Sequence, residues 1–469
     1  MTGRWFTVIL LFFNFSLLSQ TLSDSLTKKD SIIVVGKINI SGNKVTKDKI
    51  ITRELEFKTG DKYPYKVFQK KIKNSSINLQ NRQLYNFVTV TPFDSAGLTN
   101  VNVEVVERWY LWPVPIFGLA DRNFNVWWQT KDWSRINYGV DFRHDNFLGR
   151  MEKLHLILQN GYDKRVIGKW VIPYVNKNQN LGMIIAGGMQ YNHEIAYKDT
   201  LNKLLFHRFE NNFARKRYFA NVGISFRPRF KVLHYFNILY NNLWYNDSLL
   251  LLNPDLTYGK DHFQYFNLHY FLKIDYRDYA PYPLNGFYFD FTFQKTGLGI
   301  LSEDVNLWKA KFNFDQYFKI YKRFYFAYRM SAYYSGQKRF QPYFLTTGLG
   351  YDGFNLRGYE LVVVRGQKML LFKSNAKFEI IPMKVHRISF IKSEKFGKLF
   401  YAAYGNIFFD TGYANDLQTF NNNPLGNQLL WTLGVGIDII SFYSIVVRLE
   451  YSVNKQKQTG FYIDFVAPI

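Results

Sequence analysis

The chain of 469 residues can hold two or three ordinary domains, or one small domain and one large all-β unit. It contains no cysteine, which excludes disulfide bonds and thiolate metal sites. Aromatic residues make up 19% of the chain and the formal net charge is +24, yet the mean hydropathy is only −0.23. That combination is unusual for a soluble enzyme and is typical of a membrane β-barrel, where apolar and polar residues alternate.

The one long apolar run lies at the N-terminus, where Arg4 precedes W-F-T-V-I-L-L-F-F-N-F-S-L-L and S-Q-T follows. A basic start, a short apolar stretch and small polar residues are typical of a secretory signal. We predict a signal peptide at residues 1–20, cleaved near Gln20, with a permanent membrane anchor as the alternative. No later stretch reaches the roughly 18 apolar residues of a spanning helix, so a membrane crossing would have to use strands.

Residues 32–107 are predicted to form a small domain with the order β-α-α-β-β. A strand is expected over I-I-V-V-G-K-I-N-I-S, and the Gly42-Asn43 pair that follows has turn composition. Thr46 is the expected N-cap of a first helix that closes at Gly60. A second helix is expected from the apolar spacing of residues 67–79, followed by the strands F-V-T-V-T-P and V-N-V-E-V-V-E.

This small domain resembles a POTRA domain in the segments I-N-I-S-G-N-K-V-T, I-T-R-E-L, K-T-G-D and L-Y-N-F-V-T-V. POTRA domains are periplasmic modules that receive partly folded chains, so the resemblance implies a receiving role. Such a role has a physical basis, because the edge strand of a sheet offers unpaired N–H and C=O groups to an incoming extended segment.

Residues 111–469 alternate between apolar and polar positions, as expected for strands. In residues 266–277 the even positions are Phe, Leu, Tyr, Leu, Ile and Tyr, while the odd positions include Asn, His, Lys, Asp and Arg. The same alternation recurs in residues 287–294, 308–320, 324–334 and 445–452. A soluble sandwich also alternates, but charged residues on the minor face favour a barrel with lipid outside and a wet lumen. Spanning strands take roughly 9–11 residues, so we predict about 16 of them.

Pro113 and Pro115, inside W-Y-L-W-P-V-P-I-F-G, are predicted to mark a hinge between the two parts. Five tryptophans gather nearby, at Trp109, Trp112, Trp127, Trp128 and Trp133. They are expected to form either an aromatic girdle at the membrane surface or a packed linker core, and the sequence leaves both interpretations open.

A glycine-rich stretch, G-L-G-Y-D-G-F-N-L-R-G-Y-E, begins at Gly348 and contains the G-x-G-x-x-G pattern of a dinucleotide site at Gly348, Gly350 and Gly353. Such a site requires a helix directly after the glycines, within a βαβ unit. Two further glycines and three consecutive valines follow here instead. The sequence therefore argues against a nucleotide site, and we predict no cofactor.

The same stretch resembles the BamA and TamA outer-membrane assembly superfamily, in which a loop carrying (V/L)-R-G-(F/Y) folds back into the barrel lumen. The loop motif is matched by Leu356, Arg357, Gly358 and Tyr359, and the F-x-D-x-G motif of the wall strand by Phe408, Asp410 and Gly412. The resemblance implies that Arg357 pairs with Asp410. An arginine suits this place because its guanidinium is a rigid bidentate fork, which lysine lacks.

Two turn motifs extend the resemblance over nearly the whole mature chain. D-N-F-L-G, with Asn146 and Gly149, resembles the turn after the first strand, and D-Y-R-D-Y-A-P-Y-P-L-N-G-F, with Pro283 and Gly286, resembles a turn before a later strand. The chain departs from the family in having one POTRA domain where assembly proteins often have several. It also ends in F-V-A-P-I, where Pro468 cannot donate to a ladder, and this predicts a loose seam between the last and first strands.

These observations favour an outer-membrane assembly factor for β-barrel proteins, with its POTRA domain in the periplasm. The alternatives are a dedicated secretion pore for one exported partner and an accessory barrel without insertase activity. No G-x-S-x-G motif occurs and the histidines give no metal spacing, so we predict no enzyme and no metal site.

The expected partners are outer-membrane lipids and lipopolysaccharide, unfolded β-barrel clients and other subunits of an assembly complex. Nucleic acid is not expected, because no aromatic-basic binding module is present and the chain is predicted to be exported. Anionic headgroups or acidic client segments account better for the net charge of +24.

Overall fold

The computed structural model describes residues 32–119, 136–301, 305–336, 341–350, 353–360, 362–389, 391, 393–417, 422–441 and 445–465. The expected signal peptide at residues 1–20, three of the five tryptophans (127, 128 and 133) and Pro468 lie outside these ranges, so the expectations for them stay predictions. No helix in the described ranges is long and apolar enough to cross a membrane.

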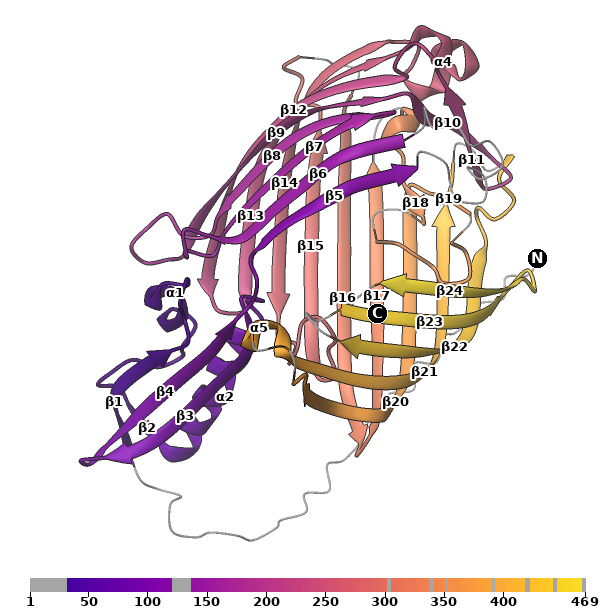
Figure 1. The fold of residues 1–469 in the computed structure, drawn as a ribbon. Helices are drawn as coiled ribbons and strands as arrows, with labels where there is room; N and C mark the ends of the chain where they lie inside the picture. The colour runs from indigo at the N-terminus through magenta and orange to yellow at the C-terminus, as the bar shows by residue number, and fades with distance from the viewer. Residues whose placement is uncertain are drawn as a thin grey trace, which may run out of the picture.

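The N-terminal domain is a four-stranded sheet with one long helix packed against it (Figure 1). The strands are β1 (Ile32–Ser41), β2 (Lys62–Pro64), β3 (Tyr85–Ser95) and β4 (Leu98–Glu107), in the order β2-β1-β4-β3. The helices are α1 (Asp48–Thr52) and α2 (Tyr65–Gln80). β4 is central because Val101, Val103 and Val105 alternate into the core, where Phe68 and Leu79 of α2 are also buried.

Two local expectations for this domain are wrong. The N-cap of α1 is Lys47, without a side-chain cap bond, whereas the backbone N–H and hydroxyl of Thr46 both donate to Glu107 at 2.7 Å. α1 also ends at Thr52 instead of reaching Gly60, because the chain leaves the helix to form β2 as an additional edge strand beside β1. In both cases a partner distant in sequence overrides the local signal.

The rest of the chain forms one sheet of 16 strands, which confirms the predicted barrel of about 16 strands. Its first eight strands are β5 (Leu111–Leu119), β6 (Ile136–Phe147), β7 (Glu152–Gly161), β8 (Lys164–Ile172), β9 (Leu181–Asn192), β12 (Arg215–Arg229), β13 (Val232–Tyr245) and β14 (His262–Asp275). The other eight are β15 (Gly286–Thr296), β16 (Leu307–Tyr321), β17 (Phe324–Gly336), β20 (Lys368–Arg387), β21 (Lys398–Asn415), β22 (Leu429–Ser441), β23 (Ile445–Asn454) and β24 (Thr459–Phe465). Figure 1 shows them curving around one interior.

Several shorter elements lie in the connections between barrel strands. They are β10 (Glu194–Thr200), β11 (Lys203–Arg208), α4 (Asp247–Leu252), η2 (Pro254–Leu256), η3 (Tyr343–Leu345), β18 (Gly348–Leu349), β19 (Val364–Arg365) and α5 (Glu394–Gly397). In Figure 1 the small domain lies at the lower left, and the β10–β11 hairpin and α4 lie at the opposite end of the barrel. The two ends of the barrel are therefore built differently.

The barrel is polar inside and apolar outside. On β22, Leu433, Val435, Ile437 and Ile439 are each at least 40% exposed, while Asp438 between them is fully buried. A soluble core would show the reverse, since it buries aliphatic side chains and leaves carboxylates in water. The outward apolar face suits a lipid surround, and the inward polar face suits a hydrated lumen.

The barrel sheet has two free edges within the described residues. β5 pairs only with β6, and β24 pairs only with β23. Pro113 and Pro115 lie inside β5, so the prediction that they form a hinge is wrong. A proline is tolerated in an edge strand when its missing N–H faces away from the neighbouring strand. Because the two prolines are two positions apart, both missing donors fall on the same side of β5.

Candidate functional site

Between β17 and β20 the described residues 341–350, 353–360 and 362–367 fold into the barrel, and they are called the lumen loop below. Phe354, Leu356 and Tyr359 of the loop are buried in one cluster with Leu371 of β20 and Leu430 of β22. This apolar cluster holds the loop against the wall in a lumen that is otherwise mostly polar. The loop thereby carries Arg357 to the barrel wall.

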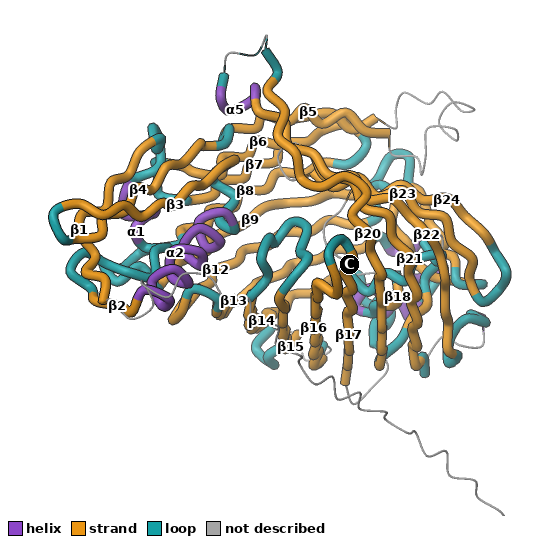
Figure 2. The backbone as a smooth tube through the Cα atoms, turned by 90° about the horizontal axis from the view of Figure 1, so that it is seen from below, coloured by secondary structure: helices purple, strands orange, loops and turns teal. Residues whose placement is uncertain are grey.

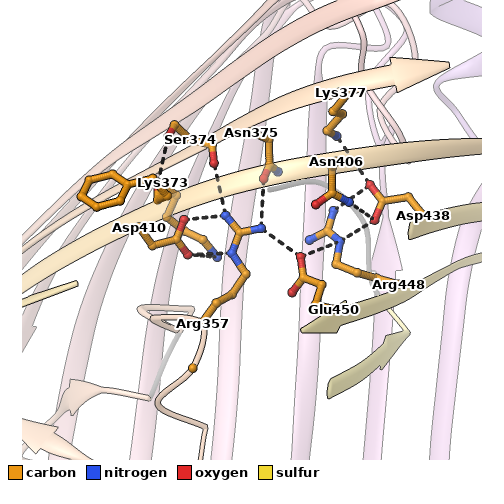
Figure 3. Close-up of polar contacts among 12 residues, drawn as sticks. Arg357, Lys373, Ser374, Asn375, Lys377, Asn406, Asp410, Asp438, Arg448 and Glu450 are labelled. Atoms are coloured by element: carbon orange, nitrogen blue, oxygen red, sulfur yellow. Dashed lines mark hydrogen bonds and ion pairs between the residues drawn. The ribbon is translucent and has the colours of Figure 1, made fainter. Parts of the chain in front are cut away.

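Arg357 is the centre of the contact between the lumen loop and the wall (Figure 3). Its Nε donates to Asp410 Oδ2 at 2.7 Å, and its Nη2 donates to the other oxygen of the same carboxylate. Its Nη1 donates to Asn375 Oδ1 and to Glu450 Oε1, both at 3.0 Å. The side chains of Arg357, Asp410 and Glu450 are 5%, 0% and 2% exposed. One arginine therefore joins β20, β21 and β23 and compensates two buried carboxylates.

Phe408 and Gly412 complete the face of β21 that meets the loop. The ring centroid of Phe408 lies 3.7 Å from Arg357 Cζ, a cation–π contact in a buried place. Gly434 on β22 makes room for this ring, since a Cβ there would lie 2.3 Å from Phe408 Cζ. Gly412 faces Leu349 and Leu356, so all three residues of the F-x-D-x-G motif face the loop.

A second polar cluster adjoins the first through Glu450. Arg448 Nε donates to Asp438 Oδ1 at 2.8 Å and lies 3.6 Å from Glu450 Oε1. Tyr282, from the turn between β14 and β15, donates to Asp438 Oδ2 at 2.8 Å. The period-two pattern places Arg448 and Glu450 on the lumen face, but it gives no sign that either one touches Arg357 or its partners.

Replacing Gly358 tests how closely the loop approaches the wall. Its φ is +76°, and a Cβ would lie 2.8 Å from Thr432 Oγ1 and 3.1 Å from Ser452 Oγ. Gly353 has a similar φ of +79°, but the nearest atom to a Cβ there is Lys311 Nζ at 3.5 Å. Both alanine variants incur the left-handed backbone cost of about 1–2 kcal/mol, and only Gly358→Ala adds a clash. The measurement is the temperature at which the barrel unfolds, seen as the change in its heat-modifiable gel mobility. We expect Gly358→Ala to lower this temperature by more than Gly353→Ala does. An equal decrease in the two variants would contradict the close approach of Gly358 to the wall.

The other glycines of the stretch shape the loop. Gly348 lies in β18, paired with Arg365 of β19, and the N–H of Gly350 donates to the carbonyl of Phe354 at 2.9 Å. No helix follows within residues 353–360, so the phosphate-binding geometry of a dinucleotide site is not formed there. The glycines instead allow a tight turn before the L-R-G-Y motif.

The lumen loop is also tied to the β10–β11 hairpin, at the barrel end opposite the small domain. Arg365 Nε donates to Asp199 Oδ1 at 3.1 Å, and Asn423 Nδ2 donates to Asp199 Oδ2 at 2.7 Å. The N–H of Val363 donates to the carbonyl of Asn202 at 2.8 Å. Asp199 and Asn202 are buried, so the hairpin tip is a fixed part of this end of the barrel.

The turn motif at Asn146 and Gly149 is where the small domain meets the barrel. Asn146 Nδ2 donates to Thr46 Oγ1 at 2.9 Å, and the N–H of Lys47 donates to the carbonyl of Gly149 at 3.0 Å. Gly149 has a φ of +67°, and a Cβ there would lie 2.1 Å from the carbonyl oxygen of Val45. This turn therefore needs its glycine for the contact between the two parts of the chain.

The Gly42-Asn43 turn prepares the same contact from the other side. Asn43 Nδ2 donates to the carbonyl of Thr46 at 2.9 Å and to Asp48 Oδ1 at 2.6 Å. Gly42 has a φ of +86° and passes next to the backbone of Val105. The turn thus fixes the segment that carries Thr46 to the barrel.

The second turn motif, with Pro283 and Gly286, meets the end of α2. Asn81 accepts from the N–H of Ala280 at 3.0 Å and donates to the carbonyl of Arg277 at 3.3 Å. Pro283 is buried in the turn, and Gly286 begins β15 with a φ of +102°. Both turn motifs therefore lie at the barrel end that faces the small domain.

Glu54 of the small domain forms a buried ion pair with the barrel. Arg227 of β12 donates from Nη1 and Nη2 to the two carboxylate oxygens of Glu54, at 2.6 and 2.8 Å. Glu54 is 1% exposed and Arg227 is 6% exposed. Burial alone would raise the pKa of Glu54, but Arg82, Arg227 and Arg53 outweigh it and lower the pKa to about 2. The carboxylate is therefore charged at neutral pH. Removing either partner would leave the other as an uncompensated buried charge.

The family described as the Omp85 superfamily domain matches residues 146–465, well over half of the chain. The chain belongs to the Omp85 superfamily. The family described as POTRA, surface antigen variable number repeat, matches residues 33–108 of this Omp85 protein. An Omp85 β-barrel with a POTRA domain is an outer-membrane protein. No curated protein matches the sequence.

Solved structures of other Omp85 proteins resemble this one. CdiB from Escherichia coli is 11% identical with a TM-score of 0.54, and the alignment covers 93% of this chain and 74% of that chain. BamA from Haemophilus ducreyi lacking POTRA domains 1–3 is 15% identical with a TM-score of 0.49, and the alignment covers 92% of this chain and 83% of that chain. At this identity the likeness to CdiB shows a shared fold and nothing about activity.

Proposed function

We propose that this Omp85 protein is an assembly factor that helps β-barrel proteins fold and insert into the outer membrane. The observation that carries the proposal is the pair of free edges of the barrel sheet, β5 and β24, each paired on one side only within the described residues. A free edge templates a further strand through its unpaired N–H and C=O groups, of which β5 lacks the N–H at Pro113 and Pro115. A client strand can add at this seam.

The POTRA domain supplies a third free edge. β3 is 11 residues long and pairs only with β4 in the domain sheet. An extended client segment can add to β3 through main-chain hydrogen bonds, which do not depend on the client's sequence. In this proposal β3 holds the client in the periplasm before the seam takes it up.

The lumen loop supports this function by bracing the wall next to the seam. Arg357 holds β20, β21 and β23 together, whereas β24 lies beyond these contacts. The wall can therefore keep its shape while its last strand exchanges partners. The proposed partners are unfolded barrel clients, outer-membrane lipids and lipopolysaccharide. The function requires no catalytic group, because the folding of the client itself is favourable.

Depletion of the protein tests the proposal. We expect a broad loss of folded barrels from the outer membrane and an accumulation of unfolded precursors in the periplasm. Heat-modifiable gel mobility and membrane proteomics measure both quantities. Loss of a single exported product with all other barrels intact would overturn the proposal and indicate a dedicated secretion pore.

A matched complementation experiment isolates the seam. The chain has no cysteine, so a pair of cysteines introduced into a variant, one on β5 and one on β24, supplies the only thiols. A pair that forms a disulfide should fail to restore folded barrels, and each single-cysteine variant should restore them. Full complementation by a locked seam would contradict a templating role for these edges.

A further inference from the structure

A cavity of about 700 Å³ lies between the end of α2 and the inner faces of β7, β8, β12, β13 and β14. Figure 2 shows α2 next to this part of the barrel. Seven basic residues and a single acidic residue, Asp275, line the cavity. We call it the basic chamber. The cavity is open to solvent, since Lys153 and Lys169 are exposed, and such an excess of one charge along the walls of a cleft attracts the opposite charge.

The arginines of the basic chamber are already engaged. Arg227 uses both terminal nitrogens on Glu54, and Arg277 donates from Nε and Nη2 to the two oxygens of Asp275, each at 2.8 Å. In each bidentate pair, the two guanidinium nitrogens that face the carboxylate are already used as donors. The chamber keeps its positive charge because other cations line it.

Three lysines supply that charge. The ammonium groups of Lys153, Lys169 and Lys231 form no ion pair or hydrogen bond with any described residue. Burial lowers the pKa of Lys231, and the nearby Asp275 opposes this effect only in part. Arg82, the third arginine of the chamber, lies 3.7 Å from Glu54 and so belongs to the same ion-paired group as Arg227. The three lysines thus give the chamber donors without a hydrogen-bond or ion-pair partner among the described residues.

We propose that the basic chamber binds a carboxylate-rich segment of an extended polypeptide. Lys153 and Lys169 are diagonal neighbours on the paired strands β7 and β8, whereas Lys231 lies in the turn between β12 and β13, with β9 between the two groups. The positive charge therefore follows a line along the chamber wall instead of a single point. Lysine acts as a flexible point charge, which suits carboxylates at varying positions. Tyr174, Tyr235 and Leu233 also line the chamber and can contact the aliphatic parts of such a segment.

The geometry fits phosphate less well, because a phosphate site uses free arginine forks or backbone N–H groups aimed at one point. The inference rests on the proposed function in one respect: the segment would belong to a client that passes between the POTRA domain and the barrel. Binding itself is measurable on the purified chain without any assembly reaction.

Fluorescence anisotropy of a labelled peptide of about ten glutamates, titrated with the full chain in detergent micelles, tests the proposal. We expect saturable binding that weakens as salt is added. The triple variant Lys153→Gln, Lys169→Gln, Lys231→Gln should weaken it about tenfold or more, since three attractive contacts are lost. A control triple, Lys66→Gln, Lys70→Gln, Lys73→Gln, removes the same charge from the exposed side of α2 and should bind as the parent chain does.

Equal weakening by the two triple variants would overturn the chamber as the site, because only net charge would then matter. Displacement of the peptide by tripolyphosphate at a lower concentration than by unlabelled peptide would overturn the polypeptide assignment in favour of a phosphate-bearing ligand. The two proposals can fail separately. Peptide binding to the purified chain tests this inference, whereas the level of folded barrels in depleted cells tests the proposed function.

Discussion

Arg357→Ala is expected to lower the free energy of unfolding of the barrel by about 3–5 kcal/mol, the range for breaking a buried ion pair by removing one partner. The variant leaves Asp410 and Glu450 buried without their shared guanidinium. The nearest remaining cations are Lys373, at 3.8 Å from Asp410, and Arg448, at 3.6 Å from Glu450. Neither replaces the bidentate contact. The measurement is the thermal or urea midpoint of heat-modifiable mobility in detergent or liposomes.

Arg357→Lys separates charge from shape. An ammonium restores the positive charge but cannot bind Asp410 through two parallel hydrogen bonds and reach Glu450 as well, so we expect it to recover only part of the loss. Limited proteolysis within residues 341–367 should report release of the loop in the alanine variant.

The matched control is Arg143→Ala, which removes another arginine–aspartate pair of the barrel. Arg143 is 55% exposed beside Asp141, so its loss should cost about 0–1 kcal/mol. If Arg143→Ala and Arg357→Ala destabilise the barrel equally, burial of the Arg357 cluster does not matter and the loop is not held as described.

Glu54→Gln is expected to loosen the POTRA domain from the barrel while both parts stay folded. The substitution leaves Arg227 buried without its carboxylate, and the amide can accept only a weaker hydrogen bond from it. A docking loss of about 3 kcal/mol raises the undocked population roughly hundredfold. Hydrogen exchange at the contacting turns, residues 145–151 and 173–180, measures that opening. Glu104→Gln, an exposed carboxylate of β4, is the control and should leave exchange unchanged.

The same carboxylate gives docking a pH dependence with a definite sign. The folded pKa of Glu54 is about 2, below its ordinary value of 4.5. Its contribution is therefore fully present above pH 4.5 and is lost as the pH falls from there towards 2. The protection factor at the two turns, which removes the intrinsic pH dependence of amide exchange, should fall over this window in the parent chain and stay flat in Glu54→Gln. A parent chain without this fall would contradict the ion pair.

The sequence alone predicted which side faces inward in five segments of the barrel, because period two depends only on neighbouring residues. It placed Arg448 and Glu450 on the inward side by alternation, and both are buried there. It also brought Arg357 and Asp410 together, although only through two family motifs and not through any local pattern. The expectations from sequence failed where a residue distant in the chain determines the contact. Thr46 is hydrogen-bonded to Glu107 and Asn146 instead of capping a helix, and Pro113 and Pro115 lie in an edge strand.

Only the tertiary structure decided which inward-facing groups meet. The contacts between Arg357 and Glu450, between Tyr282 and Asp438, and between Glu54 and Arg227 join residues far apart in sequence. Whether such residues approach each other depends on the number of strands, their stagger around the barrel and the place where the POTRA domain docks. Those quantities are properties of the curved sheet as a whole. The basic chamber follows for the same reason, since its lysines come from different strands and are gathered only when the sheet curves over α2.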